Sequence, residues 1–209
     1  MDMFKTLPDS VEIGGIEYKL NTDFRIGIKA ESVLTDKTRP EESKVEEMIR
    51  LYFPVCPPWQ YGKEIVSSII WFYTGEDVES NKKRRSMDGE EKRHFSFEHD
   101  SALVFSAFYQ QYGVDLSEVE YMHWWKFKAM FASLSEETQL VKVIQYRATK
   151  ITSKMPKETA DFYRKMKRLY ALPEDKYEDR KASFVAEALL RGESLEGITE
   201  RYYEKYGAD

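Results

Sequence analysis

Cysteine is almost absent from this sequence: Cys56 is the single cysteine among 209 residues. One cysteine excludes an internal disulfide and any zinc site that needs several cysteines, and it is typical of a reducing compartment. No apolar run approaches the roughly 18 residues that a membrane-spanning helix needs. The N-terminal MDMFKTLPDS also lacks the basic start and apolar stretch of a signal peptide. We therefore expect a cytoplasmic protein with no membrane partner.

Glycine is also scarce, with 10 residues, whereas charged residues make up 33% of the chain. High charge with little glycine favours surface-exposed helices over a β-sandwich. Hydrophobic residues make up 42% and aromatic residues 14%, which excludes overall disorder because disordered chains are poor in aromatic residues. The net charge of −5 favours solubility and argues against a dedicated nucleic-acid binder, which normally carries a basic field.

One β-strand signal stands out, near the N-terminus. Residues 11–13 and 16–20 alternate apolar and polar side chains, and Gly14-Gly15 lies between the two runs. A two-residue Gly-Gly connection is typical of a hairpin with a primed turn, because both turn residues need positive φ. We predict a β-hairpin over residues 11–20 that packs on helices, because a lone hairpin is only marginally stable in water.

The rest of the chain shows helical periodicity, so the predicted fold is mainly α: an irregular bundle of about eight or nine helices with a short N-terminal hairpin. Capping residues, prolines and glycines set the expected bounds. Asn21 and Thr22 are candidates to cap the first helix, and Ser117 with Glu120 resembles a capping box. The helices are expected at about 22–34, 40–53, 59–73, 96–112, 117–134, 136–151, 157–171, 178–191 and 194–206.

Two stretches set the expected domain organisation. Residues 76–94 have almost no apolar content and predict a long, mobile, charged loop. Residues 174–181 are charged and follow Pro173, which ends the preceding helix. We therefore expect a mainly helical body over 1–173, which holds the hairpin and the loop. A C-terminal helical pair over 174–209 would form an appendage.

No group of residues supports catalysis, a cofactor or a metal. His123 falls in an apolar stripe and is expected to be a hydrogen-bonded core residue. His94 and His99 are five residues apart, so they do not share a helix face as the two histidines of a zincin do. No serine or cysteine lies in a nucleophile signature. We predict that the protein is not an enzyme and uses no cofactor.

A basic run, Lys82 to Arg85, is the feature closest to a nucleic-acid site. No aromatic residue is interleaved with it, so it offers no stacking platform for bases. It is best explained as a solvated loop. Docking on an acidic partner, or a nucleic-acid-binding module, remain the alternatives.

The predicted helix at 117–134 has two faces that favour burial. Trp125 points about 100° away from Trp124 and shares its face with Tyr121 and Lys128. Either this helix is central, with neighbours on both sides, or Trp125, Tyr121 and Lys128 contact a partner. The predicted helix at 157–171 has a basic face that supplies a second set of candidate partner-binding residues: Arg164, Lys165 and Arg168. This face is either solvated or contacts a partner or a phosphate.

The sequence also resembles a known family. The matching blocks are Gln110–Leu116, Met122–Phe131 with its WWKFK core, Tyr146-Arg147 and Lys165–Pro173, and the early hairpin followed by Asp23-Phe24-Arg25 fits as well. These blocks, in this order, resemble a bacteriophage family named after gene product fifteen of a temperate siphophage of Gram-positive hosts. The likeness covers most of residues 1–173.

This resemblance implies a phage or prophage protein from the tail-gene cassette, acting in the host bacterial cytoplasm. Its implied role is tail assembly chaperone, with the tape measure protein and another tail assembly protein of the same cassette as partners. A chaperone for a long helical chain needs apolar grooves and solubilising charge. A structural tail or connector component retained in the virion is the alternative. The oligomeric state is not fixed by the sequence.

Overall fold

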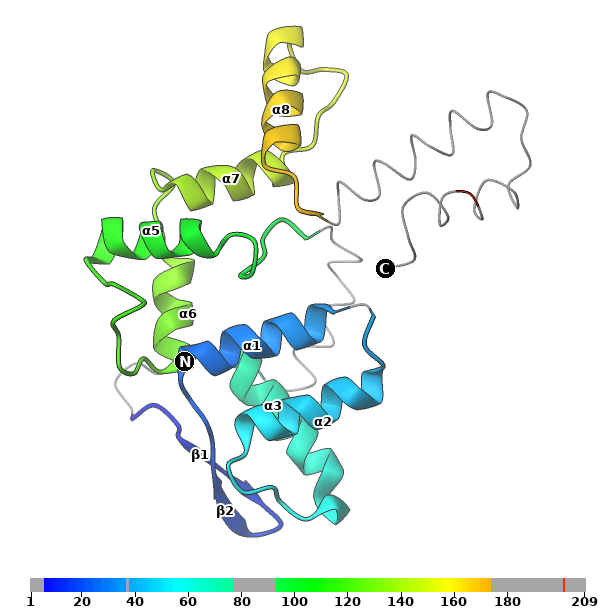
Figure 1. The fold of residues 1–209 in the computed structure, drawn as a ribbon, viewed down its shortest axis with the longest axis vertical. Helices are drawn as coiled ribbons and strands as arrows, with labels where there is room; N and C mark the ends of the chain where they lie inside the picture. The colour runs from blue at the N-terminus through cyan, green and yellow to red at the C-terminus, as the bar shows by residue number, and fades with distance from the viewer. Residues whose placement is uncertain (1–5, 37, 77–92, 174–200, 202–209) are drawn as a thin grey trace. The chain divides into compact units, whose positions relative to one another are not determined.

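The computed structural model describes residues 6–36, 38–76, 93–173 and 201 (Figure 1). It confirms a mainly helical fold with an N-terminal hairpin. Seven α-helices lie in the described part of the chain, fewer than the eight or nine expected, and the two expected at 178–191 and 194–206 lie outside it. The elements are β1 (Ser10–Ile13), β2 (Ile16–Lys19), α1 (Phe24–Thr35), α2 (Glu41–Tyr52), the 3-10 turn η1 (Trp59–Tyr61), α3 (Gly62–Thr74), α5 (Ser101–Tyr112), α6 (Trp124–Ala132), α7 (Gln139–Ala148) and α8 (Lys157–Leu169).

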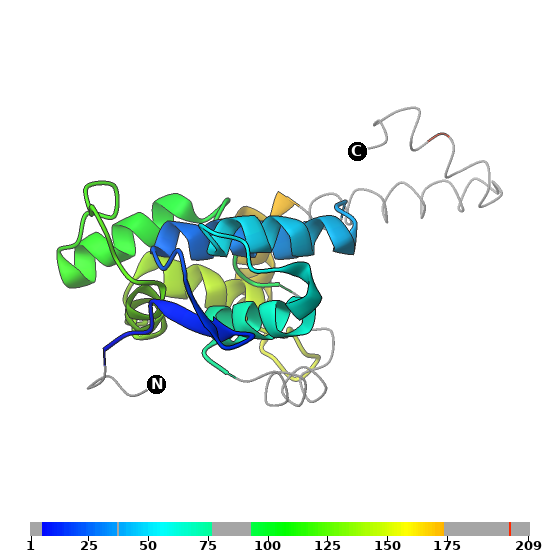
Figure 2. The ribbon, with the colours of Figure 1, turned by 90° about the horizontal axis from the view of Figure 1, so that it is seen from below.

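The predicted hairpin is confirmed. β1 and β2 pair antiparallel, with Ile13 opposite Ile16, and both glycines of the turn have positive φ, 58° at Gly14 and 76° at Gly15. The turn rests on the start of α3 (Figure 2): the Gly14 N–H donates to Glu64 Oε2 over 2.9 Å. A Cβ on Gly14 would lie 2.4 Å from the Tyr61 ring, so this position excludes a side chain for steric as well as backbone reasons.

The helix predicted over 117–134 begins later than expected, at Trp124, and ends at Ala132. The Ser117 hydroxyl bonds to Asp115 Oδ1 in a turn and does not cap a helix. His123 is the N-cap residue of α6, and its side chain accepts the Trp125 N–H. The capping-box pattern was therefore misleading, because serine and aspartate form local turns as readily as helix caps.

The first helix is capped by Asp23, not by Asn21 or Thr22. The Asp23 carboxylate accepts the Arg25 N–H over 3.0 Å. The Asn21 side chain instead donates to the Leu51 carbonyl at the end of α2. The helix expected from residue 96 also starts later, at Ser101, because residues 97–100 form a turn.

The core of the N-terminal part centres on Phe127 of α6, whose side chain is fully buried. Its ring is stacked on Phe24 of α1, Phe108 of α5 and Trp124, with ring centroids 5.0 to 5.8 Å apart. Gly27 of α1 leaves room for the Trp124 ring, because a Cβ at this position would lie 2.2 Å from that ring. Close approach of α1 to α6 therefore depends on this glycine.

Contacts divide the chain into two compact units, Met1–Lys142 and Val143–Asp209. In the second unit, the end of α7 pairs with α8. The expected loop at 76–94 lies almost entirely outside the described residues, and so does the C-terminal pair at 174–209, so the expected domain boundary after Pro173 stays a prediction. None of the described helices has both the length and the hydrophobicity that a membrane span requires.

Candidate functional site

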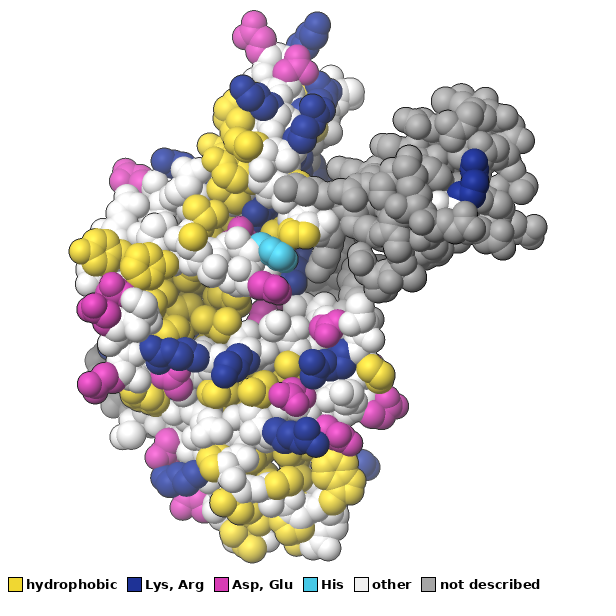
Figure 3. Space-filling view, viewed as in Figure 1, with side chains coloured by type: hydrophobic (Ala, Val, Ile, Leu, Met, Phe, Trp, Pro, Cys, Tyr) yellow, Lys and Arg dark blue, Asp and Glu magenta, His cyan; other side chains and the backbone are white. Residues whose placement is uncertain are grey.

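Helix α8 carries the exposed surface that combines apolar and basic side chains. Phe162 is 46% and Leu169 62% exposed, and Arg164, Lys165 and Arg168 are exposed beside them. We call these five residues the α8 face. Figure 3 shows yellow apolar atoms over α8, at the top of the view, with dark blue basic side chains next to them. The three basic residues predicted from sequence as second candidates thus lie on the surface.

The end of α7 holds α8 in place, partly through Phe162 of the α8 face itself. The Tyr146 ring packs against the rings of Phe162, Tyr163 and Tyr170, with centroids 5.8 to 6.4 Å apart. Arg147, itself buried, donates from Nε to the Tyr170 carbonyl over 2.6 Å. These contacts fix the orientation of α8 relative to the end of α7.

Phe162 and Leu169 are the contact candidates that the sequence analysis missed. Their spacing places them in one apolar stripe with Met166, and a stripe of this kind is typical of a helix face that packs on the protein core. In the structure Phe162 packs on Tyr146 of α7 and is still partly exposed, and Leu169 is mostly exposed. The sequence does hold a sign that the stripe is not fully buried, because basic residues flank it closely at positions 164, 165 and 168.

Trp125 is not a surface residue. It is only 8% exposed, and its indole N–H donates to the Phe72 carbonyl over 2.6 Å. Its ring meets Trp71 edge-on, with centroids 5.3 Å apart. The surface position expected for Trp125 is therefore wrong, and the alternative in which this face of the helix packs against a neighbour inside the protein is correct. The neighbour is α3.

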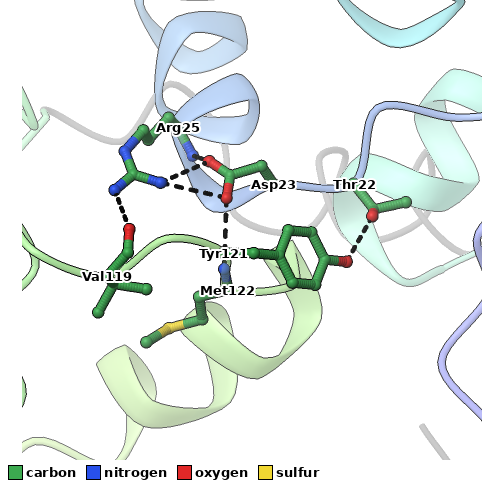
Figure 4. A network of polar contacts seen from close by, with 6 residues as sticks. All are labelled: Thr22, Asp23, Arg25, Val119, Tyr121 and Met122. Carbon is green, nitrogen blue, oxygen red and sulfur yellow. Dashed lines mark hydrogen bonds and ion pairs between the residues drawn. The ribbon is translucent and has the colours of Figure 1, made fainter.

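Tyr121 and Lys128 do not share a surface with Trp125. Tyr121 precedes α6, is 58% exposed, and its hydroxyl hydrogen bonds to the Thr22 hydroxyl over 2.6 Å (Figure 4). Lys128 is half-buried, and its ammonium donates to the Tyr73 carbonyl over 2.7 Å while lying above the Trp124 ring. Lys128 thus helps to hold α6 on α3. Tyr121 remains an exposed contact candidate, and a role of either in partner binding stays a prediction.

The starts of α1 and α6 are tied together by backbone and side chain. The Phe24 N–H donates to the Met122 carbonyl, and the Trp124 N–H donates to the Thr22 carbonyl, over 2.8 and 2.7 Å. The Asp23 carboxylate, besides capping α1, accepts the Met122 N–H over 3.3 Å and pairs with Arg25 (Figure 4). The Arg25 guanidinium also donates to the Val119 carbonyl. All these polar groups have structural partners.

His123 also has a structural role, as expected. It is 6% exposed; its Nδ1 accepts the Trp125 N–H, and its Nε2 lies 3.0 Å from the Pro8 carbonyl oxygen. Since Nδ1 accepts, the ring proton belongs on Nε2, where it can be donated to Pro8. Both ring nitrogens are thereby used to cap α6 and to hold the chain before β1.

A polar cluster lies between α1 and the end of α3. The Tyr73 hydroxyl donates to Glu31 Oε2, and the Arg93 guanidinium lies 3.9 Å from Glu31 Oε1. Burial, together with the Glu31 charge, raises the pKa of Tyr73 far above its ordinary value, so the phenol stays protonated and serves as a donor. Within the described residues, no three His, Cys, Asp or Glu side chains are grouped so as to hold a metal.

A second exposed apolar region surrounds residues 53–58, the proline-rich connector between α2 and η1. Val55 is 70% and Trp59 65% exposed, and a hollow of about 360 Å³ opens beside Phe53 and Pro54. Its polar edge is formed by Glu46 and Arg50, which lie within ion-pair distance of each other. This region has a single basic residue, Arg50, which is already paired with Glu46, whereas the α8 face has three basic residues. The basic run Lys82 to Arg85 lies outside the described residues.

No curated protein and no solved structure matches this chain. One family model, described as Bacteriophage Gp15 protein, matches residues 3–172. The match covers both the α1–α6 core and the α7–α8 pair, and it agrees with the resemblance carried by the WWKFK block. The chain belongs to the Gp15 family of bacteriophage proteins.

Proposed function

We propose that this protein is a phage tail assembly chaperone, which binds helical segments of the tape measure protein in the host cytoplasm while the tail tube assembles. Membership of the bacteriophage family supports a role in the phage particle or its assembly. The mainly helical fold, with an exposed apolar stripe on one helix, supports a binding role. The observation that carries the proposal is the α8 face.

The α8 face has the chemistry of a helix-docking surface. Phe162 and Leu169 are seven residues apart, so they lie two turns apart on the same side of α8. A partner helix that lays its own apolar stripe along this side would bury both side chains, as in helix-in-groove recognition. Complete burial of a fully exposed leucine or phenylalanine contributes about 1.5–3 kcal/mol, so Phe162 and Leu169, each about half exposed, contribute roughly half of that. Two such contacts suit a transient complex.

The basic residues of the α8 face add selectivity. Lys165 and Arg168 form no ion pair among the described residues, whereas Arg164 pairs with Asp161 over 2.5 Å. A partner helix with carboxylates beside its apolar stripe would be favoured, and a basic one would be repelled. The proposed contact set is therefore Phe162, Leu169, Lys165 and Arg168, with Arg164 at the edge and Tyr121 as a separate candidate.

Co-expression with the tape measure protein encoded beside this chain, followed by affinity pull-down and size exclusion, tests the proposal. We expect the pair to co-elute, and we expect Phe162→Ser with Leu169→Ser to abolish co-elution while helical circular dichroism is kept. Val55→Ser is the control, since Val55 is even more exposed, at 70%, but lies on the connector of the first unit.

Two results would contradict the proposal. If the proteins do not associate and this chain is found stoichiometrically in purified particles by mass spectrometry, it is a tail component. If Val55→Ser abolishes binding and the α8 variant does not, the binding surface is the connector region and the α8 assignment is wrong.

A further inference from the structure

We propose that the C-terminal segment 174–209 docks on the α8 face of its own chain when no partner is bound. The segment then competes with any partner for the same side chains. This competition rests on the proposed function, whereas the docking itself does not. Three observations point to this occupant: the uncovered stripe, the opposite charges, and the place where the segment begins.

The uncovered stripe needs an occupant. Phe162 packs on the Tyr146 ring of α7 but stays 46% exposed, and Leu169 stays 62% exposed, in the described part of the chain. Exposed apolar side chains that lie together on one helix mark an interaction surface. The second unit extends to Asp209, so a long stretch of the same unit is available to cover this stripe.

The charges of the two segments are opposite. α8 holds five basic and two acidic residues, a net charge of +3, and residues 174–209 hold ten acidic and six basic residues, a net charge of −4. The whole chain carries −5, so most of its excess negative charge lies in this last segment. Lys165 and Arg168 therefore have carboxylates of their own chain as natural counter-charges.

The apolar pattern of the segment matches a helix-docking role. The sequence predicts a helix over 178–191, with Phe184, Val185, Ala188 and Leu189 on one face. Such a helix would be about 21 Å long, longer than the roughly 11 Å between Phe162 and Leu169 along α8. Acidic residues, among them Glu178, Asp179 and Glu187, accompany this apolar face.

The start of the segment puts the predicted helix within reach. Leu172 is buried beside the end of α8, and Pro173 ends the described stretch. Residues 173–177 can span up to about 17 Å, whereas packed helices lie only about 8–10 Å apart. A short connection of this kind is the common link between antiparallel helices. The chain can therefore turn back along α8.

Self-docking would set the affinity for a partner. A partner that needs the open α8 face meets only the fraction of molecules in which the segment has left it, so its apparent dissociation constant rises by the inverse of that fraction. The docked segment would keep the apolar stripe from binding other proteins unselectively until the partner helix displaces it. Weakening the segment should then strengthen partner binding.

Carbodiimide cross-linking of the full-length protein tests the docking, because this reagent joins only amines and carboxylates in contact. In the monomer fraction we expect a cross-link between Lys165 and a carboxylate of 174–209, identified by peptide mass spectrometry. Phe184→Ser with Leu189→Ser should lower its yield by about tenfold or more, because the apolar contact is lost. The matched control, Leu195→Ser with Ile198→Ser, changes the other predicted helix and should keep it.

The outcomes separate this inference from the proposed function. If no such cross-link forms, or if it forms only in a dimer fraction, self-docking is wrong, even where the tape measure protein binds. If the cross-link forms as expected but the tape measure protein does not bind, the docking stands and the proposed function fails. If both hold, the Phe184→Ser and Leu189→Ser variant should bind the tape measure protein several-fold more tightly.

Discussion

Helices α6 and α8 make an instructive pair, because both carry aromatic and basic residues but use them in opposite ways. α6 buries Trp124, Trp125 and Phe127 and turns Lys128 inward to the Tyr73 carbonyl. α8 leaves Phe162 and Leu169 exposed and keeps Lys165 on the surface. α6 contacts α1, α3 and α5, whereas α8 is supported by the end of α7. The number of neighbouring elements, and not composition, decides which aromatic side chains are buried.

The comparison also explains the residues that carry the family resemblance. Trp124 and Trp125 in the WWKFK block donate their indole N–H groups to the carbonyls of Tyr73 and Phe72. Lys167, in a later block, donates to the Arg147 carbonyl. These contacts join helices to one another. Part of the resemblance therefore reflects the fold, although the block at 165–173 also holds Lys165, Arg168 and Leu169 of the α8 face.

The most severe test of the buried role of α6 is Trp125→Ala. We expect a loss of about 3–5 kcal/mol in the free energy of unfolding, because a large buried side chain is removed and the Phe72 carbonyl loses its donor. Urea denaturation followed by circular dichroism measures this. Trp59→Ala is the control, since this side chain is mostly exposed, and it should cost about 0.5 kcal/mol or less. Equal losses in the two variants would contradict the buried role of Trp125.

A second test concerns the close approach of α1 to α6. Gly27→Ala should destabilise the protein by about 1–3 kcal/mol, because the new Cβ would overlap the Trp124 ring, which is held by its bond to Tyr73. Gly62→Ala is the matched control: it opens α3 at helical φ with no atom within 4 Å of the new Cβ. Thermal unfolding should show it unchanged or more stable, by up to about 1 kcal/mol.

A third test concerns the bond between the starts of α1 and α6. Asp23→Ala should cost about 2 kcal/mol, at the upper end for an N-cap, because the carboxylate bonds to both Arg25 and Met122. Asp23→Asn keeps a side-chain acceptor and should recover most of this in denaturant titrations. If alanine and asparagine behave alike, Asp23 does not act through capping.

The smallest effect is expected in the turn before α6. Hydrogen bonds from the Ser117 hydroxyl and backbone N–H to the Asp115 carboxylate lower the pKa of Asp115 below its ordinary 3.8. A lowered pKa in the folded state means that the contribution to stability is present above the ordinary pKa and is lost as the pH falls through the lowered value. Carboxyl NMR titration should show this, and Ser117→Ala should move the pKa back up. An unchanged pKa in that variant would contradict the assignment.

Much of the fold was predictable from local signals. The hairpin followed from Gly14-Gly15 between alternating runs, and α2, α3 and α8 followed from proline, glycine and apolar spacing. The start of α6 was missed because Ser117 and Asp115 form a turn whose pattern matches a helix cap. The basic part of the α8 face was predicted, but its apolar part was not. Periodicity shows that a stripe is apolar without showing how much of it a neighbour covers.

The sequence by itself determined the helical class, the hairpin, the buried histidine and the family, because these depend on spacing, capping and ordered blocks along the chain. Tertiary structure alone decided that Trp125 is buried and that Phe162 and Leu169 are exposed. Burial depends on how many elements pack around a helix, and here Gly27 lets α1 approach α6, whereas α7 leaves Phe162 and Leu169 of α8 partly exposed. Such neighbours are distant in the chain, so no local pattern records them.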